Sequence, residues 1–339
     1  MSRPAPASAP GPDPSRPSRR VSRRAVRGLP RAAWQSRGYS DEDLRRGVRR
    51  GELLRLGRGL YSAGLTVDDP ALQARLTLQA LTADGQHAAS HATAAALLGL
   101  PGHRPGDGAA PLGPPFHLTR VDGRKALRRD GLVLGYRARV PASQLVRVAG
   151  VLSTGPARTW VDLARESTVD ELVVLADQLI RIPRPEFEGI VEPWTDLETL
   201  RGVVQGRRGT PGAATARAAL ELARVGSDSP RETQLRLALH RAGLPEPEVN
   251  AWILDESGRA VHQPDLMLRR WRIAINYEGR HHSDPLQIER DVARQEGLQL
   301  LGWEDLRITD RRSRDVWRPA VEKVTGSLLR AGWWPGCPW

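Results

Sequence analysis

Side chains that could hydrolyse a phosphodiester gather in the last third of the chain. Asp265 opens a short apolar strand over 266–268, and the β-branched and aromatic residues of 272–277 predict a second strand. If these strands pair antiparallel, Asp265 lies across from the end of the second strand. Because side chains alternate between the two faces of a strand, Asn276 and Glu278 share a face. The pattern predicts polar groups that converge at the open end of a hairpin.

Hydrolysis of a phosphodiester needs a divalent cation that holds the phosphate oxygen and generates hydroxide from water. Mg²⁺ prefers hard oxygen ligands, typically one or two carboxylates with water and substrate phosphate. We therefore expect Asp265 as the first Mg²⁺ ligand and position 276 as the second. Asn276 offers a neutral carbonyl oxygen without a charge, so Glu278 is the candidate to substitute for it. His282 could serve as a general acid or base, or could orient the water.

Several short motifs follow one another in this part of the chain. They are Glu232, Pro264-Asp265-Leu266, Asn276-Tyr277-Glu278-Gly279, His282, Asp291 with Arg294, Gly302-Trp303 and Arg307. In this order they resemble the restriction-endonuclease-like superfamily, whose signature is PD-(D/E)xK, and within it the domains similar to very-short-patch-repair endonucleases. The resemblance implies an α/β nuclease core with Glu232, Asp265, Glu278 and His282 as catalytic residues. One departure matters, because that family usually has Glu where this chain has Asn276.

Each of these motifs has an ordinary structural explanation when it stands alone. Pro-Asp is common at the start of strands, Glu278-Gly279 can simply end a strand, and a histidine pair in a loop is usually solvated. Asp291 and Arg294 lie three residues apart, which fits an ion pair on the surface of a helix. Only the order of the motifs favours a nuclease fold, so retained and lost catalysis both stay open.

The formal charge of +12 is distributed unevenly along the chain. Residues 1–65 hold 15 arginines against five acidic residues, a net +10, whereas residues 66–339 hold 36 basic and 34 acidic residues, a net +2. Lys125 and Lys323 are the only lysines, and such arginine-rich usage often reflects a GC-rich genome. A genome bias does not place charge at one end, so the asymmetry indicates a nucleic-acid partner.

Residues 25–65 have the pattern of a small winged helix-turn-helix. A short helix is expected over 29–35, and Ser40 with Asp43 three residues later predicts a capped second helix over 41–50. Strands on either side of a Gly-Arg-Gly turn would form the wing. The arginines expected to contact DNA are Arg45, Arg46, Arg49, Arg50, Arg55 and Arg58. Those on the helix form i, i+4 pairs of like charge, which destabilise a helix unless a polyanion neutralises them. The alternative is a structural cap with a solvated basic face.

The stretch from Gly38-Tyr39-Ser40 to Leu60-Tyr61 also resembles the N-terminal domain of AbiEi-like antitoxins from abortive-infection systems. The resemblance continues more weakly through 90–101 and 116–120. It implies a DNA-binding or repressor role without specifying an operator, and it leaves a toxin partner open.

The middle of the chain mixes helices with short strands and is interpreted as a scaffold. Helices are expected over 71–83, 90–98, 156–165 and 169–180, and strands over 116–120 and 132–137. His91 and His117 have no carboxylate or cysteine companions nearby in the sequence. Packing or hydrogen bonding therefore explains these two histidines better than a metal site does.

We therefore expect an α+β multidomain protein. The expected parts are a disordered basic arm at 1–24, a winged helix-turn-helix at 25–65, a mixed α/β middle domain at 66–225, a restriction-endonuclease-like α/β core at 226–332 and a tail at 333–339. A polar hinge is expected within 206–230, and an upstream misassigned start codon is the alternative explanation of the arm. The single cysteine, Cys337, excludes disulfides within the chain and cysteine-based zinc sites. Without an apolar run of about 18 residues or an apolar signal-peptide core, a cytoplasmic protein with no membrane span is expected.

Two classes of function follow. The first is a Mg²⁺-dependent DNA endonuclease or nickase, weakened at Asn276 and targeted by the winged helix. The second is a non-catalytic DNA-binding regulator or antitoxin-like protein that keeps a degenerate nuclease fold. Asp265, Glu278, His282 and Glu232 favour the enzyme, whereas Asn276 favours the regulator.

Overall fold

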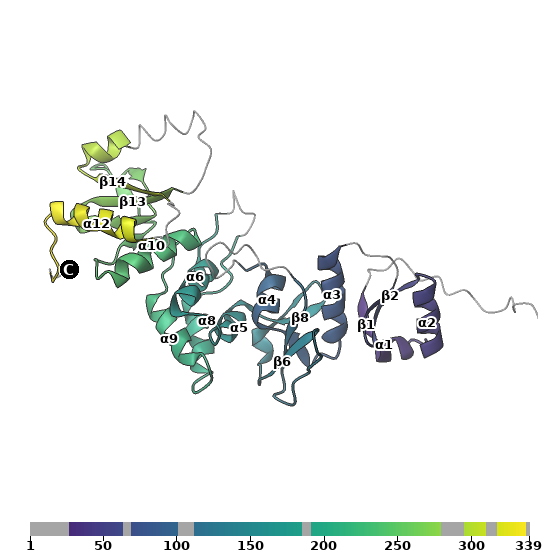
Figure 1. Cartoon of the computed structure of the whole chain (residues 1–339). Helices are drawn as coiled ribbons and strands as arrows, with labels where there is room; N and C mark the ends of the chain where they lie inside the picture. The colour runs from purple at the N-terminus through teal and green to yellow at the C-terminus, as the bar shows by residue number, and fades with distance from the viewer. Residues whose placement is uncertain are drawn as a thin grey trace, which may run out of the picture. The chain divides into compact units, whose positions relative to one another are not determined.

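A computed structural model describes residues 27–63, 69–100, 112–184, 191–278, 295–309 and 317–336. The chain divides into two compact units, Met1–Ala83 and Asp84–Trp339, and Figure 1 shows the elements of each. Several predicted features lie outside the described residues, namely the arm at 1–24, His282, Asp291, Arg294 and Cys337.

The first unit is a three-stranded antiparallel sheet with three helices among its described residues. In chain order the elements are β1 (Gly28–Pro30), α1 (Arg31–Gln35), α2 (Asp41–Arg49), β2 (Leu53–Gly57), β3 (Leu60–Ala63) and α3 (Pro70–Leu81), and the strand order is β1-β3-β2. The capping box predicted for α2 is confirmed. The Asp43 N–H donates to Ser40 Oγ over 3.1 Å, and the Ser40 N–H donates to an Asp43 carboxylate oxygen over 2.9 Å. Trp34, Leu44 and Leu53 form the core.

Helix α3 belongs to the first unit, although the sequence predicts it as part of the middle region. A Cβ at Gly28 would lie 1.6 Å from the Leu76 carbonyl oxygen, so only glycine allows β1 to approach α3 this closely. The Gly28 N–H also donates to Gln79 Oε1 over 3.1 Å. The first unit therefore ends at Ala83 rather than at residue 65, because α3 packs on β1.

The second unit begins with a five-stranded mixed sheet of order β6-β5-β4-β8-β7. The strands are β4 (His87–Ala89), β5 (Phe116–Arg120), β6 (Val133–Arg137), β7 (Leu145–Val148) and β8 (Val151–Thr154), with a short 3-10 helix, η1 (Ala142–Gln144), before β7. β5 is parallel to β6, and β4 is parallel to β8. β4 and β5 are antiparallel, as are β7 and β8. The strands predicted over 116–120 and 132–137 agree with β5 and β6 to within one residue.

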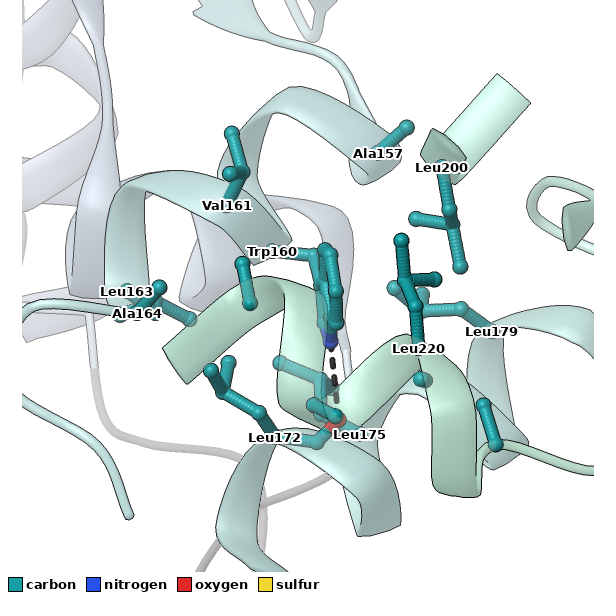
Figure 2. Packing of buried hydrophobic residues seen from close by; sticks show 14 of the residues in the cluster. Ala157, Trp160, Val161, Leu163, Ala164, Leu172, Leu175, Leu179, Leu200 and Leu220 are labelled. Carbon is teal, nitrogen blue, oxygen red and sulfur yellow. Dashed lines mark hydrogen bonds between the residues drawn. The ribbon is translucent and has the colours of Figure 1, made fainter. Parts of the chain in front are cut away.

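A helical core follows this sheet along the chain. Its helices are α4 (His91–Leu98), α5 (Pro156–Leu163), α6 (Val169–Ile180), α8 (Leu197–Gln205) and α9 (Ala213–Leu222). Figure 2 shows Trp160 at the centre of the apolar cluster, where its indole Nε1 donates to the Leu172 carbonyl over 2.8 Å. Ala216, Ala219 and Ser227 are fully buried. Helix α9 therefore occupies the middle of 206–230 and packs into this core, while the polar hinge expected within this range stays a prediction.

The C-terminal part of the second unit is built on a four-stranded sheet of order β14-β13-β12-β9. Its elements are α10 (Pro230–Arg241), β9 (Glu248–Val249), β10 (Ile253–Leu254), β11 (Ala260–His262), β12 (Leu266–Leu268), the 3-10 helix η2 (Arg269–Trp271), β13 (Ile273–Glu278), a helical segment at 295–300, β14 (Glu304–Thr309) and α12 (Arg318–Arg330). β12 is antiparallel to β9 and β13, and β13 is parallel to β14.

Apolar side chains cover both faces of this sheet. On one face α10 and α12 pack against the strands, as Figure 1 shows, with Leu235 and Val324 in the same cluster as Ile273. On the other face Met267 and Ala274 pack with Leu298 of the helical segment. Trp333 is buried in the cluster that α10 and α12 form with the sheet. This apolar core therefore extends past residue 332, where the sequence predicts the domain to end.

The chain leaves the four-stranded sheet at Asn250. This residue takes a positive φ of 46°, and β9 ends at the residue before it. β10 starts only at Ile253 and pairs with β11 in a separate two-stranded sheet. The predicted antiparallel pairing of β12 with β13 is confirmed, with Leu266 opposite Ile275.

Candidate functional site

The predicted DNA-binding arginines of the first unit are exposed, and most of those on α2 have acidic neighbours. Glu42 pairs with Arg45 over 3.3 Å and with Arg49 over 2.9 Å, and Asp43 lies 3.9 Å from Arg46. Carboxylates from the first turn of the helix therefore lie among these arginines and offset part of the repulsion between them. The guanidinium groups in turn lower the pKa of Glu42.

The remaining arginines of this set lie where the helix and the hairpin end. Arg50 is the C-terminal capping residue of α2, Arg55 is on β2, and Arg58 is in the turn between β2 and β3. All three are exposed. Acidic residues occupy the N-terminal turn of α2 and arginines its later turns, an order that the helix dipole favours. These exposed basic side chains are carried by α2, β2 and the β2–β3 turn, and we call the set the arginine face (Arg45, Arg46, Arg49, Arg50, Arg55 and Arg58).

In the second unit, the structure brings Asp265 and Glu232 together. Glu232 is on α10, two residues inside its start, where the Ser229 hydroxyl accepts from the Glu232 N–H over 3.2 Å. Its carboxylate accepts from the Asp228 N–H over 2.8 Å and from the Asn250 side chain over 3.4 Å. Burial first, and the negative charge of Asp265 second, raise the pKa of Glu232 to about 7. Asp265 accepts from the Tyr277 N–H over 2.6 Å.

Asn276 and Glu278 contact other partners on the same strand face. The Asn276 amide donates to Asp305 over 2.6 Å, and its oxygen lies 3.1 Å from His262 Nε2. Glu278 pairs with Arg307 over 3.1 Å, and Arg307 Nε lies 3.6 Å from Asp305. Arg307, on the strand β14 that runs parallel to β13, therefore lies between the carboxylates of Glu278 and Asp305. Its positive charge takes the place that a metal cation would have between them. Sequence reasoning assigns no role to His262 or Asp305, because the register of β13 with β14 has no local signal.

The predicted metal ligands lie on neighbouring strands, Asp265 just before β12 and Asn276 and Glu278 on β13. Within residues 27–63, 69–100, 112–184, 191–278, 295–309 and 317–336, no group of three His, Cys, Asp or Glu side chains is arranged to hold a metal ion. Asp265 lies near Glu232, while Asn276 and Glu278 contact Asp305 and Arg307. His282 lies outside the described residues, so its catalytic role stays a prediction.

Histidines 91 and 117 are held by hydrogen bonds and stacking, as the sequence predicts. His91 Nδ1 lies 3.0 Å from Ser90 Oγ, and the Tyr136 hydroxyl lies 3.0 Å from His117 Nδ1. The rings of His91 and Tyr136 stack with their centroids 3.8 Å apart. Burial first, and the nearby His117 second, lower the pKa of His91 to about 3, so the ring is neutral near pH 7.

A buried ion pair that sequence reasoning missed joins α6 to α10. Arg236 donates to Asp177 over 2.9 Å, and both side chains are almost completely buried. Asp177 also accepts from the Arg224 N–H over 2.7 Å and from the Thr233 hydroxyl over 3.0 Å. Because 59 residues separate Arg236 from Asp177, no local pattern could reveal the pair. Helix α10, which carries Glu232, is thereby tied to the helical core.

Comparison with known proteins identifies one family in the middle of the chain. Residues 87–180, from β4 to the end of α6, match the model of the AbiEi antitoxin C-terminal domain. The segments 90–101 and 116–120, which carry the weaker part of the AbiEi-like resemblance, lie within this match. The chain is also similar to two uncharacterized proteins of Mycobacterium tuberculosis, MT2308 and Rv2248. Each is 28% identical over 258 residues, which covers 76% of this chain and 85% of the relative.

No solved structure matches this chain. The winged-helix assignment of the first unit and the nuclease-like assignment of the C-terminal part therefore stay predictions. Among the described residues, no helix has the length and apolar character needed to cross a membrane.

Proposed function

We propose that this protein is a DNA-binding regulator of the antitoxin type, and that its C-terminal part keeps a nuclease-like fold without catalysis. The observation that carries the proposal is the match of residues 87–180 to the AbiEi antitoxin C-terminal domain, directly after a small basic unit. In that unit two short helices precede a hairpin, and a third strand joins the hairpin in a sheet. This is the order of elements expected of a winged helix-turn-helix.

The arginine face gives the first unit a way to hold DNA. α2 would enter the major groove with Arg45, Arg46 and Arg49, while Arg55 and Arg58 of the hairpin would contact phosphates. The ion pairs of α2 with Glu42 are exposed, so exchanging a carboxylate for a phosphate requires little desolvation. The affinity of such a surface should depend strongly on salt, because each phosphate contact releases condensed counterions.

The contacts of the C-terminal residues support the non-catalytic interpretation. A Mg²⁺ site would need the carboxylates of the strand face to be directed at one cation. Instead, Arg307 pairs with Glu278, and the Asn276 amide bridges His262 and Asp305. These polar groups satisfy one another, as expected of a fold that serves as a binding module.

A Mg²⁺-dependent endonuclease is the second candidate, and one observation favours it. Glu232 and Asp265 are close enough for the charge of Asp265 to raise the pKa of Glu232, and paired carboxylates of this kind can hold a divalent cation. Glu232 and Asp265 would hold the metal, which would supply a polarised phosphate and an activated water. The Tyr277 N–H orients the Asp265 carboxylate in either case.

Binding and cleavage assays on the full chain separate the two candidates. Fluorescence anisotropy should show duplex DNA binding with a chelator present, and supercoiled plasmid should stay intact with Mg²⁺ or Mn²⁺. The matched variant is Asp265→Asn, which keeps the size of the side chain and should bind DNA as wild type does. Nicking by wild type that Asp265→Asn abolishes would establish the endonuclease instead. A failure of wild type to bind any duplex would contradict the regulator.

A further inference from the structure

Basic side chains gather a second time in this chain, around strand β6. Residues 120–139 hold seven basic and two acidic residues, a net +5, whereas the rest of 66–339 sums to −3. The exposed ones among them are Arg124, Lys125, Arg128, Arg137 and Arg139. This segment lies within the antitoxin-like match and is separate in sequence from the arginine face.

Strand β6 is at one edge of the five-stranded sheet. The Phe116 N–H donates to the Leu132 carbonyl over 2.8 Å, and the Ala138 N–H donates to the Arg120 carbonyl over 3.1 Å. Because β5 and β6 are parallel, every second residue of β6 directs its peptide groups towards β5, and the residues between them direct theirs outwards. The outward residues are Val133, Gly135 and Arg137.

Only part of this edge is covered by the described chain. Val133 exchanges backbone hydrogen bonds with Arg129, over 2.8 and 3.3 Å, which closes the first part of the edge. Among the described residues, the peptide groups of Gly135 and Arg137 have no neighbouring strand, although the Leu127 carbonyl packs against Gly135, where a Cβ would lie 1.8 Å from its oxygen. They present N–H donors and C=O acceptors in alternation, at the spacing of one more strand.

A pocket of about 490 Å³ adjoins the edge. Its lining combines apolar groups with two arginines and one carboxylate, and includes Pro115, Arg128, Arg129, Asp130, Leu134 and Tyr136. Leu134, which also lines this pocket, is 46% exposed and supplies apolar surface beside the edge. Backbone groups, apolar surface and positive charge are thus combined at one place.

We propose that the β6 edge and this pocket bind an extended acidic segment of a protein partner, which adds to the sheet as a strand beside β6. A strand supplies both an acceptor for the outward N–H groups and a donor for the outward C=O groups. A nucleic-acid phosphate could accept from the N–H groups but would leave the C=O groups without a donor. The excess of arginine around β6 would attract an acidic segment. Leu134 would contact apolar side chains of that segment, which occur at every second position because side chains alternate along a strand. This inference does not rest on DNA binding by the first unit.

The test uses ¹⁵N-labelled full-length protein and a blocked eight-residue peptide of alternating Glu and Val. Strand addition should slow hydrogen exchange at the Gly135 and Arg137 amides by at least about tenfold at saturation, because both become hydrogen-bonded. The same peptide with Lys in place of Glu should bind at least about tenfold more weakly. A duplex of about 16 base pairs should leave the two amides unprotected.

Two variants separate strand addition from simple charge attraction. Arg137→Pro removes the outward N–H without removing a bond to β5 and should weaken the peptide about fivefold relative to Arg137→Ala. Arg128→Glu should weaken it about tenfold, whereas Arg147→Glu, an exposed arginine on the opposite edge strand β7, should not. Unchanged thermal unfolding of Arg128→Glu and Arg147→Glu keeps this comparison valid if Arg137→Pro fails to fold.

Three outcomes would overturn the proposal. The acidic peptide does not bind, or it binds without protecting Gly135 and Arg137, or the duplex binds more tightly than the peptide and loses affinity in Arg128→Glu. The third outcome would make this surface a nucleic-acid site. None of the three bears on the arginine face.

Discussion

Charged side chains are used in opposite ways on α2 and around α10. On α2, Glu42 pairs with Arg45 and Arg49, and the side chains are all more than half exposed. Around α10, Asp177 and Arg236 are 0% and 1% exposed. An exposed pair contributes about 0–1 kcal/mol and can exchange partners, whereas a buried charge left without its partner is strongly destabilising. The first arrangement is available to bind a polyanion, and the second maintains the fold.

Asn276 and Glu278, two of the residues expected to hold Mg²⁺, lie between these extremes, because both are half-buried and both have polar partners. Asp305 is only 9% exposed and accepts from Asn276, and Arg307 lies beside both Asp305 and Glu278. A site in which each polar group already has a partner is poorly suited to recruit a cation. This contrast is the physical basis for assigning DNA recognition to the arginine face and a structural role to the network on β13 and β14.

The largest expected effect comes from breaking the buried pair. Asp177→Ala removes the fully buried carboxylate partner of Arg236, leaves it only the partly exposed Glu246, and should reduce the free energy of unfolding by about 3–5 kcal/mol. Glu42→Ala, the matched change on α2, should reduce it by no more than about 1 kcal/mol. Urea unfolding of both variants measures the difference. Equal effects would remove the distinction between the two regions.

The next effect is a pH dependence of stability that originates in His91. Its folded-state pKa of about 3 lies below the ordinary value of 6.5, so the unfolded chain binds the proton more readily. The stabilisation is present above pH 6.5 and is lost as the pH falls towards 3, by up to about 1.4 kcal/mol per unit.

His91→Asn tests this dependence, because Asn does not titrate and tolerates the positive φ of 50° found at this position. Unfolding free energies of wild type and variant should differ less at pH 4.5 than at pH 7. Other groups, such as Glu232, also titrate in this range, so a pH slope in His91→Asn that equals the wild-type slope would contradict the burial argument.

The sequence predicts helices and strands well where residues that are close in the chain make the stabilising contacts. Ser40 and Asp43 gave the start of α2, and the hairpin of β12 and β13 followed from the alternation around its turn. The packing of α3 on β1 could not be predicted, because it depends on one close contact between Gly28 and Leu76. The break at Asn250 was equally hidden, since a positive φ at a single residue decides it.

The sequence predicts which residue types form the candidate site, but it does not predict which side chains they contact. Alternation correctly placed Asn276 and Glu278 on one face, but the parallel register puts Arg307 opposite Asn276, across a long connection. Arg307 therefore reaches Glu278, and no spacing in the sequence states this. The proximity of Glu232 to Asp265 was expected only from the family resemblance.

A smaller effect should follow from Asn276→Glu. The new carboxylate would lie beside Asp305, remove an amide donor, and reduce the free energy of unfolding by about 1–3 kcal/mol. Plasmid nicking with Mg²⁺ or Mn²⁺ should stay absent, because Arg307 still pairs with Glu278. Asn276→Gln, which keeps an amide, is the control. Metal-dependent nicking that appears in Asn276→Glu and disappears in Asn276→Glu with Asp265→Ala would show a nuclease disabled at this one position.

The salt dependence of DNA binding tests the central claim most directly. The test variant replaces Arg45, Arg46, Arg49 and Arg50 with Gln, and the control variant replaces four exposed arginines of the second unit, Arg201, Arg208, Arg217 and Arg259. We predict weaker binding for the test variant and a slope of log K against log salt that is shallower by up to about 0.9 for each phosphate that the protein no longer neutralises. The control variant should match wild type in both. Unchanged affinity and slope in the test variant would contradict the assignment of DNA recognition to the arginine face.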